Sequence, residues 1–229
     1  MEKMYEILMG LPLFNGVSRE RMIEIVGNTK FHFLKYLEGE TIVSEGTPCT
    51  HIKFIISGSA RLSITNVTGR FTVSQTLEAP DVIAPEFLFG MSNTYPCTAI
   101  ASSPTGILQI DKNDYLHILN SDRIFLYNFL NTLSIKAQKG TEGILALTTG
   151  ALDQRLAYWI IALTQRSGKD ITMTCKTRDL YSLFGVQRSS FMATLDSMKA
   201  QGYLDYEPGI IYIKSRQRLL DILHTSTDS

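Results

Sequence analysis

Arg188, Ser189 and Ser190 open a short segment in which apolar residues recur at helical spacing. The apolar positions of this segment are Phe191, Leu195 and Met198. A helix that buries this stripe turns its other face outward, and that face carries Arg188, Ser189, Met192, Ala193 and Asp196. Guanidinium and hydroxyl groups form hydrogen bonds with phosphates and with base edges. An exposed helix with these groups therefore has the chemistry to enter a DNA major groove.

A second short helix is expected directly before this one. Leu180, Leu183 and Phe184 fall at i, i+3 and i+4, Thr177 is placed to cap the helix, and Gly185 is placed to end it. Two short helices joined by a glycine turn form a helix-turn-helix pattern. The same geometry occurs in helical bundles that bind no nucleic acid, so the pattern alone leaves both interpretations open.

A hairpin is predicted after the second helix. The sequence YLDYEPGIIYIKSRQR places β-forming residues on both sides of the turn pair Pro208-Gly209. Lys214, Arg216 and Arg218 follow closely and could bind phosphates, although such clusters are more often a solvated surface. A helix-turn-helix with this hairpin, or wing, is a winged-helix arrangement.

The composition excludes several function classes. The 229 residues contain 22 Lys and Arg and 22 Asp and Glu, so a polybasic mode of nucleic-acid binding is excluded. Residues 151–229 carry a local excess, with 10 Lys and Arg against 8 Asp and Glu. No phosphate-cradling loop, dinucleotide motif, catalytic-serine motif or metal-ligand set is present, which argues against an enzyme and against a metal site.

The three cysteines, Cys49, Cys97 and Cys175, are far apart in sequence and are expected to be buried small hydrophobes. A redox-sensing role for one of them stays open. No signal segment and no membrane-spanning apolar run is recognised, so a cytoplasmic location away from any membrane is expected.

Short β-rich runs occupy residues 31–110, after a small helical entry at residues 1–28. Helical patterning returns afterwards with a heptad stripe, which we call the seam: Leu126, Leu130, Leu133, Ala137, Gly140, Ile144 and Leu147. Such a stripe predicts a parallel homodimer, and the alternative is packing on the chain's own β-rich part. Phe125 and Phe129 are expected to pack on that part from a neighbouring face.

This order of parts resembles the CRP/FNR family of bacterial transcription regulators. The start LPLFNGVS, Gly39-Glu40, Glu45-Gly46 and the sequence IISGSA at residues 55–60 carry the resemblance together with the winged helix-turn-helix. The resemblance implies an α+β protein. Residues 1–120 would form a jelly-roll (double-stranded β-helix) sensor of the cyclic-nucleotide-binding type. Residues 121–149 would form the dimerisation helix and hinge, and residues 150–229 the DNA-binding domain.

The sensor departs from the pattern of family members that bind cyclic AMP. In those members the phosphate-binding segment, called the phosphate cassette, carries a Gly-Glu pair and, ten residues beyond the Glu, an Arg followed by Ser or Thr. Here Glu86 matches the Glu, but Pro85 stands in place of the Gly. Pro96 and Cys97 stand in place of the Arg and of the Ser or Thr. A buried phosphate without an arginine is poorly compensated, so cyclic AMP is not expected as the effector. No cofactor is predicted, and an unidentified small-molecule effector is left open. Candidate pocket residues are Arg61, Glu86, Tyr95, Cys97 and Thr98.

The resemblance assigns Arg188, Ser189 and Ser190 to base or phosphate contacts, while a second family arginine falls on Ala193, so the operator sequence cannot be transferred. The predicted DNA-contacting residues are Lys176, Arg178, Gln187, Arg188, Ser189, Ser190, Ala193, Lys214 and Arg216. The implied partners are a pseudo-palindromic DNA duplex, a second copy of the chain and RNA polymerase. The alternative is a small-molecule sensor whose C-terminal module contacts protein instead of DNA.

Overall fold

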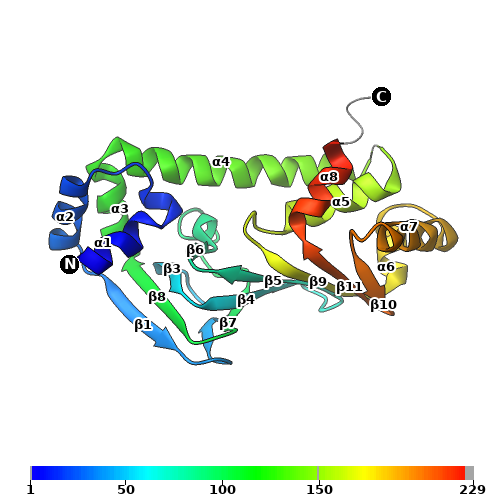
Figure 1. Ribbon diagram of the computed structural model, residues 1–229, viewed down its shortest axis with the longest axis horizontal. Coiled ribbons are helices and arrows are strands. Elements are labelled where there is room, and N and C mark those ends of the chain that lie inside the picture. The colour runs from blue at the N-terminus through cyan, green and yellow to red at the C-terminus, as the bar shows by residue number, and fades with distance from the viewer. Residues whose placement is uncertain (1, 149, 225–229) are drawn as a thin grey trace. The chain divides into compact units, whose positions relative to one another are not determined.

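The computed structural model describes residues 2–148 and 150–224 (Figure 1). The chain divides into two compact units, and each has its own hydrophobic core. The first comprises Met1–Leu62 and Leu77–Lys136, and the second comprises Ser63–Thr76 and Ala137–Ser229. The fold is α+β, with a β-rich N-terminal part, a long helix and a C-terminal helix-turn-helix part, as the sequence predicts. No helix in the described ranges is long and apolar enough to cross a membrane.

The first unit begins with helices and continues with short strands. The helical elements are α1 (Glu2–Met9), η1 (Pro12–Phe14), α2 (Arg19–Asn28), η2 (Pro85–Phe87), α3 (Lys112–Ser121) and the start of α4 (Arg123–Ala146). The strands before α3 are β1 (His32–Tyr36), β2 (Thr41–Val43), β3 (His51–Ser57), β4 (Ser59–Thr65), β5 (Phe71–Glu78), β6 (Asp81–Ile83), β7 (Thr98–Ala101) and β8 (Thr105–Asp111), of which β4 and β5 extend into the second unit. One antiparallel sheet has the order β1-β8-β3-β6, and β2 pairs with β7.

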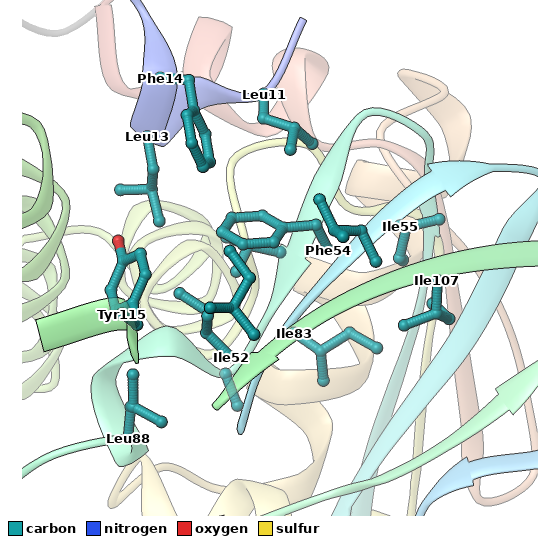
Figure 2. Packing of buried hydrophobic residues seen from close by; sticks show 14 of the residues in the cluster. Leu11, Leu13, Phe14, Ile52, Phe54, Ile55, Ile83, Leu88, Ile107 and Tyr115 are labelled. Carbon is teal, nitrogen blue, oxygen red and sulfur yellow. The ribbon is translucent and has the colours of Figure 1, made fainter. Parts of the chain in front are cut away.

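Aromatic rings join the entry helices, the sheet and α4 in the first core. The Phe14 ring lies 5.7 Å from that of Phe54 and 5.5 Å from that of Phe125, both edge to face. Figure 2 shows Phe14, Leu11 and Leu13 of the entry segment facing Phe54 and Tyr115. Because Phe125 and Phe129 are almost fully buried in this core, they fasten the start of α4 to its own unit.

The second unit contains the winged helix-turn-helix. Its elements are α5 (Leu152–Leu163), β9 (Lys169–Cys175), α6 (Thr177–Leu183), α7 (Arg188–Ala200), β10 (Asp205–Glu207), β11 (Ile210–Ser215) and α8 (Arg216–His224). Strand β11 pairs antiparallel with both β10 and β9. Gly185 and Gly209 have φ angles of 65° and 83°, left-handed conformations that glycine adopts without steric cost in the two predicted turns. The expected Thr177 cap is wrong: Lys176 is the N-cap residue of α6, and no side chain caps that helix.

The end of the β4–β5 hairpin belongs to the second unit, which the sequence patterns do not indicate. Strand β5 pairs antiparallel with β9, with Val73 opposite Met173. Val73 is buried in the second core, and the Phe71 ring lies 5.2 Å from the Trp159 ring. The Gln165 amide donates to Oε1 of Gln75 at 2.8 Å. A segment more than 60 residues before α5 therefore completes the core of the second unit.

Candidate nucleic-acid interface and sensor site

Helix α7 presents the face that its sequence predicts. Phe191, Leu195 and Met198 are buried, and the Phe191 ring stacks at 6.1 Å on the Phe184 ring at the end of α6. The predicted contact residues of this region are exposed: Gln187, Arg188, Ser189, Ser190 and Ala193. Gln187 is the N-cap residue of α7, and the others lie in its first two turns. The helix can therefore place these groups against a ligand without disturbing its core.

Arg155 of α5 fixes the turn between α6 and α7, and the sequence patterns do not indicate this role. Its Nη2 donates to the Phe184 carbonyl at 2.7 Å and also to the Leu147 carbonyl. The guanidinium carbon lies 5.6 Å from the centre of the Phe184 ring. The Arg155 side chain thus satisfies two carbonyls at chain turns and holds the start of α7 in place.

The four predicted DNA-contacting cations outside α7 have different environments. Lys176 and Arg178 are exposed at the start of α6. Lys214 lies in β11, and its side chain is outside the described part of the structure. Arg216 requires a correction: it is 6% exposed and donates to the Ile161 carbonyl at 3.2 Å, and burial lowers its pKa. A guanidinium buried against α5 fastens α8 to its own domain and cannot contact a DNA backbone.

The wing is joined to α7 by polar contacts. The Tyr206 hydroxyl of β10 donates to Oδ1 of Asp196 at 2.5 Å. Lys199 forms an ion pair with Asp205 at 2.6 Å, and its Nζ lies 5.5 Å from the centre of the Tyr206 ring. These side chains connect the outward face of α7 with the first strand of the wing.

Most of the predicted seam is exposed on α4 in the single chain. Leu126, Leu130 and Ile144 are 40%, 52% and 70% exposed. Ala137 and Gly140 are exposed as well, while Leu133 is partly buried against the first core. Leu147 follows the end of α4 and packs against the second core. Gly143 lies beside the seam and is buried, because α5 passes so close that a Cβ atom at Gly143 would overlap that of Ala162.

In the sensor, Glu86 is paired with a cation of the long helix. Its carboxylate accepts a hydrogen bond from Nζ of Lys136 at 2.5 Å, and both side chains are about a third exposed or less. Glu86 lies in η2, directly after buried Pro85. Lys136 is not among the predicted pocket residues, because no sequence pattern links a position in α4 with the η2 turn.

The other predicted pocket residues are mostly part of the fold. Tyr95 and Cys97 are buried in the first core, where the Tyr95 hydroxyl donates to the His51 carbonyl at 3.0 Å. Burial, together with a smaller contribution from Glu86, raises the pKa of Cys97 to about 12. Thr98 is partly buried, and its hydroxyl accepts from the Glu45 amide at 3.2 Å.

Arg61 lies half-buried in β4. All three cysteines are unpaired and buried. Among the described residues, no group of three or more His, Cys, Asp or Glu side chains is arranged to hold a metal ion.

Residues 33–122 match the cyclic nucleotide-binding domain family, and residues 154–222 match the Crp-like helix-turn-helix domain family. No curated protein matches the chain. Among solved structures, the catabolite activator protein of Thermus thermophilus is similar in fold, with 20% identity and a TM-score of 0.54 over 93% of this chain and 99% of that one. A transcriptional regulator from Thermotoga maritima shows 22% identity and a TM-score of 0.50 over 56% of this chain and 98% of that one. With a domain of the cyclic nucleotide-binding family followed by a Crp-like helix-turn-helix, the chain belongs to the CRP/FNR family of DNA-binding transcription regulators, a non-enzymatic family.

Proposed function

We propose that this regulator binds a pseudo-palindromic operator as a homodimer and responds to an effector other than cyclic AMP. The observation that carries the proposal is the exposed N-terminal face of α7, with Arg188, Ser189 and Ser190 on a helix whose opposite stripe is fully buried. Helix-turn-helix proteins read base edges with this part of the second helix. Lys176 and Arg178, exposed at the start of α6, supply cations for the DNA backbone.

The exposed seam supports the homodimer. Leu126, Leu130 and Ile144 present apolar side chains to solvent along one helix, and burying them against a second copy is favourable by about 25 cal/mol for each Å² of apolar surface removed from water. Two recognition helices related by a twofold axis read half-sites about one helical turn, roughly 34–36 Å, apart.

The effector proposal rests on charge. Pro96 and Cys97 occupy the positions of the family's phosphate-binding pair, and Cys97 is buried as an uncharged thiol. Lys136, which is near the cassette, is already paired with Glu86. A cyclic phosphate bound there would lose its hydration without gaining a bidentate arginine contact. We therefore expect no saturable binding of cyclic AMP in calorimetry, and saturable binding would refute this part of the proposal.

The DNA-binding part is tested by selecting sequences from random duplex DNA with the full-length protein. We expect two copies of one short motif in inverted order. Arg188→Ala should weaken binding to the selected operator and reduce its salt dependence, whereas Arg123→Ala, which removes an exposed arginine at the start of α4, should change neither. If Arg188→Ala binds like the unchanged protein, the docking assigned to α7 is wrong.

The homodimer is tested by sedimentation. Leu130→Asp places a charge in the seam and should shift the protein towards monomer, whereas Leu116→Asp, at a similarly exposed position on α3, should not. If both variants remain dimeric to the same extent, the dimer interface lies elsewhere.

A further inference from the structure

The outward face of α7 carries a carboxylate that no predicted DNA contact includes. Asp196 is exposed and is the single acidic residue in the sequence of α7. Ser189 and Ala193 precede it at i−7 and i−3, so all three share one side of the helix. Because both of these side chains are small, they leave the carboxylate accessible along that side. The distance along the helix axis from Ser189 to Asp196 is about 10 Å, or roughly three base pairs.

The carboxylate is held in place by the wing. The Tyr206 hydroxyl, which is protonated at neutral pH, donates to Oδ1 of Asp196, and this hydrogen bond raises the Tyr206 pKa. The ammonium group of Lys199 lies over the Tyr206 ring, and Lys199 forms an ion pair with Asp205. A carboxylate has about four acceptor sites on its two oxygens, so the Tyr206 contact leaves acceptor capacity for a ligand.

A carboxylate on a DNA-reading face is selective because it can only accept hydrogen bonds. It is repelled by phosphates and by the acceptor atoms of guanine and thymine, whereas the N4 amino group of cytosine is a pure donor in the major groove. We propose, on the basis of the operator binding inferred above, that Asp196 is a specificity-determining residue that accepts a hydrogen bond from a cytosine N4 amino group in each half-site. Tyr206 acts as a positioning residue for this contact.

The test is sequence selection with the full-length protein and four variants, whose folding is checked by circular dichroism and thermal melting. The unchanged protein should prefer cytosine at one position of each half-site, by about fivefold to tenfold. Asp196→Ala should abolish that preference and retain the preferences at the other positions. Tyr206→Phe should weaken the preference without changing the base.

Asp196→Asn separates base reading from a merely structural role. An asparagine Oδ1 still accepts the Tyr206 hydrogen bond, but its amide group matches adenine, so the preferred base at the same position should change from cytosine to adenine. Asp179→Ala removes an exposed carboxylate from α6 and controls for charge alone; it should leave the motif unchanged.

Two results would overturn the inference. Asp196→Ala could tighten binding to all sequences equally, as Asp179→Ala would, or Asp196→Asn could leave the motif unchanged. Either would mean that Asp196 acts only through charge or through the wing. If the unchanged protein itself enriches no sequence, the proposed operator binding fails first, and the inference fails with it.

Discussion

Gly143 offers a sharp test of how the end of α4 packs on α5. In most helices, Gly→Ala stabilises by about 1 kcal/mol because alanine loses less backbone entropy. Here the added Cβ would overlap that of Ala162, and overpacking of this kind costs about 1–3 kcal/mol. We therefore expect Gly143→Ala to lower the free energy of unfolding of this unit by up to about 2 kcal/mol. Gly140→Ala, on the same helix with open space around it in the single chain, should raise that free energy by up to about 1 kcal/mol in the Leu130→Asp background, where the proposed seam contact is weakened.

A double-mutant cycle with Ala162→Gly isolates the contact. Ala162→Gly alone should cost about 1 kcal/mol of helix propensity, but it removes the atom that the new Cβ at Gly143 would strike. The double variant should therefore be more stable than the sum of the single effects predicts, by about 1–3 kcal/mol. The assay is guanidinium unfolding followed through Trp159, the single tryptophan of the chain, at a fixed protein concentration. Effects that add to within about 0.5 kcal/mol would refute the assigned helix contact.

Three further predictions concern buried groups. Because burial raises the pKa of Cys97 to about 12, this thiol should resist a thiol-reactive dye in the folded protein at pH 8 and react after unfolding. The free energy of unfolding that comes from keeping this thiol protonated in the folded state is complete below about pH 8.5 and is lost as the pH rises through about 12. Rapid labelling of the folded protein would contradict its burial. Arg216→Met should lower the melting temperature, whereas Arg178→Ala should leave it unchanged and, because a dimer loses two phosphate contacts, make the slope of log affinity against log salt less steep by about 1.8. Phe71→Ala should change the emission of Trp159 and destabilise the second unit, and unchanged emission would argue against their contact.

The helix-turn-helix could be predicted because its determinants are local. The buried stripe of α7, the turn at Gly185 and the hairpin at Gly209 each depend on residues within a few positions of one another. The role of Arg216 could not be predicted in the same way, since its hydrogen-bond partner is the Ile161 carbonyl, 55 residues earlier. The local sequence does not distinguish a buried arginine that donates to a distant carbonyl from an exposed arginine that binds a phosphate.

The sensor illustrates the same limit over longer distances. The β-rich texture of residues 31–110 predicts the strands, but the pairing of β5 with β9 joins residues about 100 positions apart and changes which unit the hairpin end belongs to. The pairing of Glu86 with Lys136 likewise joins η2 to a helix 50 residues later. The family resemblance matches Glu86 with the Glu of the phosphate cassette, but it does not indicate which cation of the chain pairs with that carboxylate.

The charge distribution bears directly on how this protein can distinguish an operator from other DNA. Among the described side chains, Lys176, Arg178 and Arg188 are exposed cations near the DNA-reading face of each protomer. A dimer would therefore neutralise about six phosphates, and the slope of log affinity against log salt concentration would be about −5. That is a moderate non-specific affinity, in keeping with a net charge of zero. Asp196 lowers it further for any sequence that offers no donor to its carboxylate. Specificity in such a protein therefore depends less on attraction to the DNA backbone than on the cost of placing a held carboxylate opposite the wrong base.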